Sequence, residues 1–236
     1  EDLAALAPVR VPDPFGDVGD PALAAKPLDA PGRFVVAEVV QPAEDLTVDP
    51  ENLRKAIAEY PDRKFKIGSF SACSNVTGVF TPYHELASIM HEHGGICFVD
   101  FAASAPYVDI NMHPGNPMEK LDAIFFSPHK FLGGPGSAGV LIFDKSLYNA
   151  KVPDQPGGGT VDWTNPWGEF KYVDDIEARE DGGTPGFLQV IRAALAIELK
   201  EKMNTVAMKQ RDGQLLKRAF EGLSDIRGVH ILADNI

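Results

Sequence analysis

The chain has 236 residues, a formal net charge of −12 at pH 7 and a hydrophobic fraction of 44%. This length and composition are typical of a soluble globular protein with one substantial α/β core. The acidic balance argues against a nucleic-acid partner, which would favour a basic face, and no apolar run approaches the roughly 20 residues that span a bilayer.

The first elements follow a proline-rich start. Residues 1–33 carry six prolines among alanines and aspartates, a spacing that defeats helices and strands, so we predict an irregular lead-in there. A strand is expected over 34–40, where FVVAEVV is strongly apolar. A helix should then cover 50–60, with Asp49 as its N-cap and Pro50 at its first position.

A repeating pattern of strand, helix and strand follows. We predict a strand over 65–71, a turn over 74–78, a helix over 81–94 and a strand over 96–100. Strand, helix and strand of these lengths form a βαβ unit, so the sheet should be mostly parallel. Two further strands are expected, at about 122–127 and 138–143.

The remainder is predicted as a loop and two helices. Residues 151–168 are rich in glycine, proline and tryptophan, which indicates a long loop of the kind that is usually functional. After it, apolar residues recur every four positions and predict a helix with one buried stripe, formed by Phe187, Ile191, Leu195 and Leu199. A helix over 206–222 and a strand near 229–233 complete the chain. The ends of the sequence suggest a piece of a longer protein.

Lys130 is the most informative residue. It follows a strand-like apolar run and precedes four glycines within residues 133–139, so the sequence predicts a lysine in buried β-structure with room for something bulky beside it. Lysine forms Schiff bases with carbonyl cofactors, and it does so best where apolar surroundings free its amine. Asp100 ends another apolar run, and together the two residues suggest a pyridoxal phosphate site.

Polar residues follow three separate predicted strands, at Asn75, at Asp100 and at Ser127, His129 and Lys130. In open parallel sheets, ligands bind beyond the carboxyl ends of the strands. Each residue alone could be an ordinary turn or capping residue. Their convergence at neighbouring strand ends favours a binding site.

Two other patterns have structural explanations. Residues 134–139 match the G-x-G-x-x-G dinucleotide fingerprint, but here the glycines precede a predicted strand and not a helix, so we exclude a Rossmann site. His84, His91 and His93 lack the H-E-x-x-H spacing of a zinc site. We expect no metal there, and we expect these histidines to be solvent-facing.

Four motifs resemble, in order, those of the class V aminotransferase family, and the likeness is strongest to its cysteine desulfurase and selenocysteine lyase group. The motifs are SNVTG at 74–78, Val99-Asp100 followed by Ala105-Pro106, Ser127-x-His129-Lys130, and Gly183-Thr184-Pro185.

The resemblance covers about residues 34–222. It implies a three-layer α/β fold, with a mostly parallel sheet flanked by helices, as in the large domain of fold type I pyridoxal phosphate enzymes. This domain would be incomplete here and would span 34–205, with the start of a small C-terminal domain over 206–236. The family further implies a homodimer and an amino-acid substrate.

The resemblance also implies roles for the strand-end residues. Lys130 would form the internal aldimine with pyridoxal phosphate and move the proton at the substrate's α-carbon. Asp100 would keep the pyridine nitrogen protonated, and Asn75 would contact the phenolic oxygen of the ring. Ser127 and His129 would bind the phosphate.

Thr184 has two interpretations. By the resemblance it would reach the phosphate bound by a partner subunit. Alternatively, it is the N-cap of the following helix, with Pro185 as the first helical residue.

The expected reaction is cysteine or selenocysteine desulfuration, with transamination as the alternative. Ala103 stands where the family commonly has Gln or His, and neither Cys73 nor Cys97 lies where a sulfur-accepting cysteine would. Both cysteines lie in apolar segments, which fits a reducing cytoplasm. A structural or interaction piece without activity of its own is the remaining hypothesis.

Overall fold

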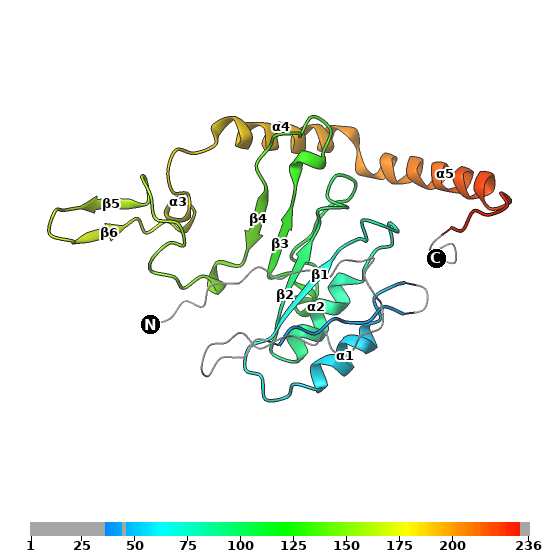
Figure 1. Ribbon diagram of the computed structural model, residues 1–236, viewed down its shortest axis with the longest axis horizontal. Coiled ribbons are helices and arrows are strands. Elements are labelled where there is room, and N and C mark those ends of the chain that lie inside the picture. The colour runs from blue at the N-terminus through cyan, green and yellow to red at the C-terminus, as the bar shows by residue number, and fades with distance from the viewer. Residues whose placement is uncertain (1–35, 44–45, 232–236) are drawn as a thin grey trace. The chain divides into compact units, whose positions relative to one another are not determined.

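The computed structural model describes residues 36–43 and 46–231 (Figure 1). The chain divides into two compact units, residues 1–41 and 42–236. The predicted lead-in over 1–33 lies outside the described residues. Residues 36–40 form no strand, so the strand predicted over 34–40 is wrong for its described part. A high β-propensity does not make a strand where no neighbouring strand pairs with the segment.

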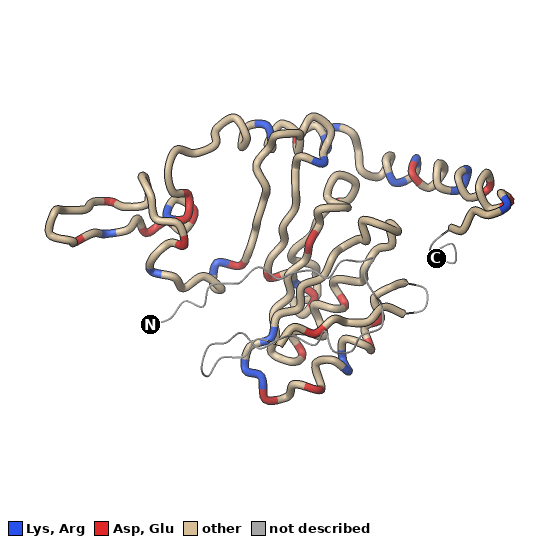
Figure 2. Tube along the Cα trace, in the orientation of Figure 1, with Lys and Arg blue, Asp and Glu red and all other residues tan. Residues whose placement is uncertain are grey.

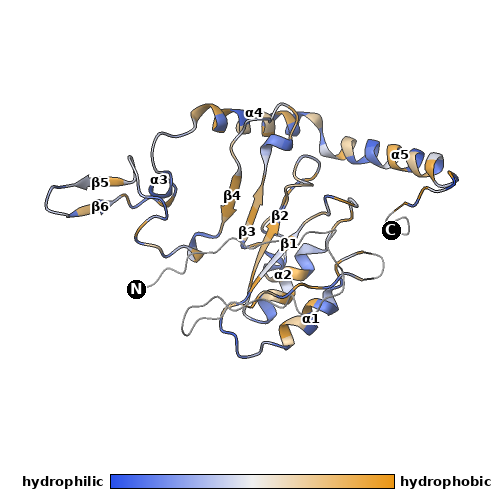
Figure 3. Cartoon of the chain, in the orientation of Figure 1, coloured by the Kyte–Doolittle hydropathy of each residue, from blue (hydrophilic) through white to orange (hydrophobic). Residues whose placement is uncertain are grey.

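A four-stranded sheet forms the centre of the second unit, in the order β1-β2-β3-β4 (Figure 1). Its strands are β1 (Ile67–Ser71), β2 (Ile96–Asp100), β3 (Ala123–Phe126) and β4 (Val140–Phe143). β2 pairs in parallel with β1 and with β3, and β4 is antiparallel to β3. The predicted α/β fold with a mostly parallel sheet and flanking helices is confirmed. Figure 3 shows β2 and β4 as largely apolar, as expected of strands in a covered sheet.

The register of the sheet aligns the carboxyl ends of three strands. Ser71 at the end of β1 is paired with Asp100 at the end of β2, and Asp100 is paired with Phe125 on β3. The residues that follow these strands therefore leave the sheet at the same edge.

Two helices with the expected caps and apolar faces pack near the sheet. In α1 (Pro50–Ala58), the predicted N-cap Asp49 accepts a hydrogen bond from Glu51 N–H at 2.9 Å. α2 (Tyr83–Glu92) connects β1 to β2 and ends before Gly94, which has a φ of +67°. Both helix predictions are confirmed. The buried side chains of these helices are Leu53, Ile57, Leu86, Ala87, Ile89 and Met90.

The apolar stripe predicted after residue 186 lies on a helix but is not buried. The helix is α4 (Phe187–Met203), and it is followed by α5 (Thr205–Leu223), which confirms the second predicted helix. α4 buries only Ala193 and Ala196, because no residue that the structure describes covers the stripe. The exposed fractions are 63% for Phe187, 54% for Ile191, 59% for Leu195 and 37% for Leu199.

Residues 151–168 contain more regular structure than the predicted loop. β5 (Val161–Thr164) and β6 (Phe170–Tyr172) form an antiparallel hairpin, and α3 (Ile176–Glu180) follows it. Near the end of the chain, residues 229–231 form no strand, so that prediction is wrong for its described part. Short 3-10 helices are η2 (Pro117–Glu119), η3 (Pro128–Lys130) and η4 (Lys145–Leu147).

Charged residues are dispersed along the described chain, where Figure 2 shows lysines and arginines on several separate elements. Among the helices that the structure describes, none is long and apolar enough to cross a membrane. The division into domains at residue 205 stays a prediction.

Candidate active site

Lys130 ends η3, directly after β3. Its N–H donates to Ser127 O at 3.0 Å, and the next residue, Phe131, donates to Pro128 O at 2.9 Å. Pro128 and Phe131 are buried, and the Phe131 ring stacks on Phe126 with 5.9 Å between ring centroids. The backbone around Lys130 is therefore anchored, although its side chain is exposed. The prediction of a lysine in buried β-structure is wrong, because Lys130 ends a 3-10 helix and its side chain is exposed.

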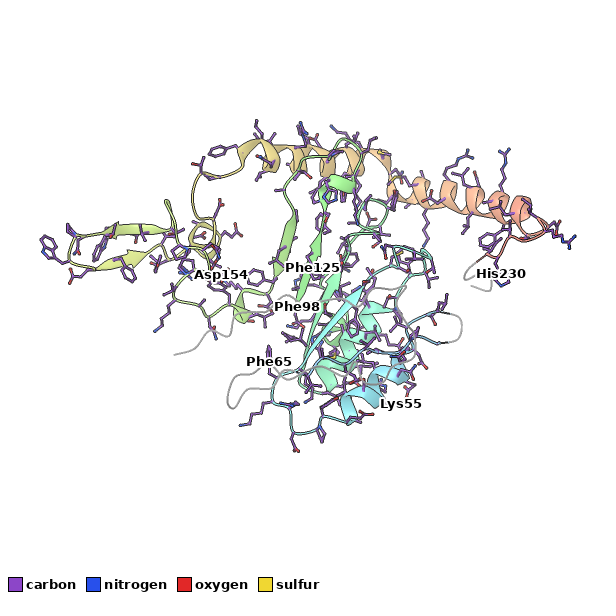
Figure 4. The ribbon with its side chains drawn as sticks, in the orientation of Figure 1. Lys55, Phe65, Phe98, Phe125, Asp154 and His230 are labelled. Carbon is purple, nitrogen blue, oxygen red and sulfur yellow. The ribbon has the colours of Figure 1, made fainter. Side chains whose placement is uncertain are left out.

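Asp100 lies at the carboxyl end of β2. Its Oδ1 accepts a hydrogen bond from Ala102 N–H at 2.7 Å, so one carboxylate oxygen caps the turn after the strand. Its Oδ2 makes no hydrogen bond to any residue that the structure describes. Asp100 and Ser127 line one hollow of about 350 Å³ at this edge of the sheet. Phe125, labelled in Figure 4, lies on β3 beside it, and the other lining residues are Ala102, Phe126, Gly139, Val140 and Leu141.

His129 and Lys130 line a second hollow, of about 440 Å³, which α4 borders through Ala196, Lys200 and Met203. The structure therefore brings Asp100 and Ser127 together, but it places Lys130 in a different hollow. Within the described chain, Lys130 Nζ makes no hydrogen bond or ion pair.

Asn75 lies exposed in the predicted turn over 74–78. Ser74 Oγ accepts hydrogen bonds from the N–H groups of Val76 and Thr77 at 3.2 and 3.1 Å, and Gly78 has a φ of +76°. The turn prediction is confirmed. Asn75 is presented at the strand-end edge but lines neither hollow.

Thr184 is exposed in the segment before α4 and lines neither hollow. The N-cap of α4 is Gly186, and the helix begins at Phe187. The interpretation of Thr184 as the cap and Pro185 as the first helical residue is therefore wrong. Phe187 N–H donates to Pro185 O at 2.9 Å, so Pro185 lies in the turn before the helix.

A buried charged cluster lies at the opposite, amino-terminal end of β3. Asp122 is 2% exposed, and its carboxylate contacts His91 Nε2 at 2.7 Å, Cys97 N–H at 2.8 Å and Lys120 Nζ at 3.0 Å. Burial alone would raise the pKa of Asp122, but the hydrogen bonds from these three partners outweigh it and lower that pKa. The cluster joins α2, β2 and β3.

The histidine prediction fails at His91, which points into this cluster. Its Nδ1 lies 2.7 Å from Met118 O, and its side chain is only 11% exposed. His84 Nδ1 likewise contacts Glu119 O at 2.7 Å, and His93 Nδ1 contacts Ile89 O at 2.8 Å. The spacing of histidines along a helix could not reveal partners some thirty residues away.

Cys73 and Cys97 are free and buried. Burial raises the pKa of the Cys97 thiol to about 12, with a further contribution from the charge of Asp122. Burial also raises the pKa of the Cys73 thiol. Since the thiolate is the reactive form, burial and the raised pKa disfavour both thiols as nucleophiles at neutral pH.

The strand-end geometry has known counterparts. The family model of class V aminotransferases matches residues 32–235, so the chain belongs to this family. A probable cysteine desulfurase of Halalkalibacterium halodurans is 30% identical over 192 residues, which are 80% of this chain and 44% of that protein. A probable cysteine desulfurase 2 of Mycobacterium leprae is 31% identical over 171 residues, which are 72% of this chain and 39% of that protein.

The structure of this chain is also similar to solved structures of cysteine desulfurases. A cysteine desulfurase from Thermococcus onnurineus NA1 matches with a TM-score of 0.67 and 27% identity, over 80% of this chain and 44% of that one. The cysteine desulfurase CsdA from Escherichia coli also has a TM-score of 0.67, with 25% identity over 79% of this chain and 44% of that one. The predicted family resemblance is confirmed. The chain spans less than half the length of these relatives.

Proposed function

We propose that this chain forms the cofactor-binding part of a pyridoxal-phosphate-dependent enzyme that acts on an amino acid, with cysteine desulfuration as its reaction. The observation that carries this proposal is the alignment of three strand ends. Asp100 ends β2, Asn75 follows β1, and Ser127 and Lys130 follow β3. The similarity to proteins named cysteine desulfurases supports the choice of substrate.

The residues at this edge fit the chemistry of pyridoxal phosphate. Asp100 keeps one carboxylate oxygen without a hydrogen-bond partner among the described residues, and this oxygen can pair with a protonated ring nitrogen. Phe125 and Phe126 give the hollow beside it an apolar wall that suits a planar ring. Ser127, which lines this hollow, and His129, which lines the second one, are donors of the kind that a phosphate requires.

Each residue would then have a defined task. The cofactor, when bound, supplies an electron sink for bond cleavage at the substrate's α-carbon. Lys130 would hold the cofactor through its amine and move a proton at that carbon. Asp100 would keep the ring nitrogen protonated, and Asn75 would orient the ring through its phenolic oxygen. Since Lys130 Nζ is exposed and has no partner in the described chain, its long side chain can rotate out of the second hollow.

Thr184 and the assembly complete the proposal. Thr184 is exposed and is not engaged as a helix cap, so its hydroxyl is available to a phosphate bound by a partner subunit. We therefore propose a homodimer. The two free, buried cysteines fit a reducing compartment, and we place the protein in the cytoplasm.

Transamination is the second candidate, and two observations favour it. Ala103 offers no polar side chain beside the cofactor site. Burial and the raised pKa of both thiols make Cys73 and Cys97 poor sulfur acceptors.

Product analysis of the full protein separates the two reactions. With pyridoxal phosphate, cysteine, a thiol reductant and 2-oxoglutarate as an amino acceptor, we expect alanine and sulfide in equal amounts, because desulfuration cleaves the carbon–sulfur bond and leaves the amino group on the product. A keto acid from cysteine together with an equal amount of glutamate, without sulfide, would instead favour transamination. If none of these products forms, the proposed activity is wrong.

A further inference from the structure

The loop that carries Lys130 consists of short turns. The lysine side chain makes no hydrogen bond to any residue that the structure describes. Because Lys130 Nζ has no partner in the described chain, the position of this side chain depends on the backbone that carries it. The backbone is closed by four hydrogen bonds of 2.9–3.0 Å, from Lys130 N–H to Ser127 O, Phe131 N–H to Pro128 O, Gly134 N–H to Phe131 O and Ser137 N–H to Gly134 O.

Gly134 is the point at which this loop folds back on η3. A Cβ atom at residue 134 would lie 1.8 Å from Pro128 O and 3.0 Å from Phe131 O. Both are backbone atoms of buried residues, so neither can move away without displacing η3. The neighbouring Gly133 differs, since it has a φ of +78° and open space around its Cβ position.

α4 holds the same loop from the other side. Arg192 Nη1 donates to Pro135 O at 2.6 Å, and Gln189 O accepts from Ala138 N–H at 3.2 Å. The small residues Ala193 and Ala196 are the buried positions of α4, which allows the helix to approach the loop closely. Residues 134–138 are thus fixed between η3 and α4.

We propose that Gly134 and Arg192 are positioning residues for the amine of Lys130, a role that rests on the proposed function. Gly134 lets the loop close tightly against η3, and Arg192 holds the closed loop in place. Neither residue needs to touch the cofactor. Together they fix the backbone from which Lys130 extends, and so they set how readily its amine meets the cofactor's aldehyde.

Gly134→Ala in the full protein tests the first residue. The readout is the rate at which pyridoxal phosphate becomes covalently attached to Lys130, followed by absorbance and verified by borohydride reduction and peptide mapping. We expect attachment to slow by up to about 100-fold, because a displacement of about 1 Å at a reacting group can cost that much. Gly115→Ala is the matched control, because its Cβ position has no atom within 4 Å, and it should attach the cofactor at the wild-type rate.

Arg192→Ala provides a second test that does not depend on whether Gly134→Ala folds, since Arg192 is exposed. We expect severalfold slower attachment with an unchanged melting temperature, and partial recovery in Arg192→Lys, which keeps a cationic donor. Wild-type attachment rates in Arg192→Ala and in folded Gly134→Ala would overturn the positioning role alone. Absence of attachment in the wild-type protein would overturn the proposed function, and this inference with it.

Discussion

Asp100→Asn is expected to lower the turnover of the full protein on the order of 10²-fold, as removal of one preorganised active-site group typically does. The asparagine keeps a side-chain oxygen that can accept the hydrogen bond from Ala102 N–H, now made at 2.7 Å. It cannot supply the negative charge that would hold a ring nitrogen protonated. Turnover should therefore fall while the urea midpoint of unfolding stays nearly unchanged.

Asp49→Asn is the matched control for this substitution. Asp49 also accepts a backbone hydrogen bond two residues ahead, from Glu51 N–H at 2.9 Å, but it caps α1 and lines neither hollow. Its asparagine variant should keep wild-type turnover. Wild-type turnover in Asp100→Asn as well would leave Asp100 with only its capping role.

Asp122→Ala should lower the free energy of unfolding by about 3–5 kcal/mol, because it removes the central carboxylate from a buried charged cluster. His91 Nε2 and the buried N–H of Cys97 would lose their acceptor, whereas Lys120 would keep its contact with Asp144 at 3.5 Å. Urea denaturation at pH 7 measures the effect. Asp162→Ala is the control, since this aspartate is exposed and pairs with an exposed Lys171, and its urea midpoint should not move.

The difference in stability between the wild type and Asp122→Ala should depend on pH, because the pKa of Asp122 is lowered in the folded protein. Burial works against the ionised form, but the bonds from His91, Cys97 N–H and Lys120 favour it more strongly, so the folded-state pKa lies below the ordinary value of 3.8. The stability that Asp122 contributes is therefore present above about pH 4 and is lost as the pH falls through the lowered pKa. The gap between Asp122→Ala and the wild type should narrow in acid. A gap that stays constant from neutral pH to below pH 3 would contradict this account.

The sheet could be predicted from the sequence because its strands are short apolar runs bounded by glycine, proline and polar residues. β2 and the turn over 74–78 are examples in which local chemistry agrees with the fold. The stripe on α4 shows the limit. Its four-residue period indicates which side chains share a face, but burial depends on what covers that face.

At the candidate site, too, local sequence predicts some positions correctly and fails where the position depends on tertiary structure. The prediction that Asp100 and Ser127 lie close together is confirmed, because the carboxyl ends of neighbouring parallel strands meet at one edge of the sheet and both residues line one hollow there. Lys130 was not placed there, because the direction of its side chain depends on the η3 turn that follows the strand. The local sequence permits Thr184 as a helix cap, whereas the helix begins three residues later, at Phe187.

The most direct test of the central claim is the position at which the protein binds pyridoxal phosphate covalently. The full protein is incubated with the cofactor, reduced with borohydride and digested, and the modified peptide is identified by mass spectrometry. We predict modification of Lys130, its loss in Lys130→Ala, and its retention in Lys200→Ala, where the removed amine lines the same hollow but donates to Val108 O. Modification spread over surface lysines, or unchanged in Lys130→Ala, would contradict the assignment of Lys130 as the cofactor-binding lysine.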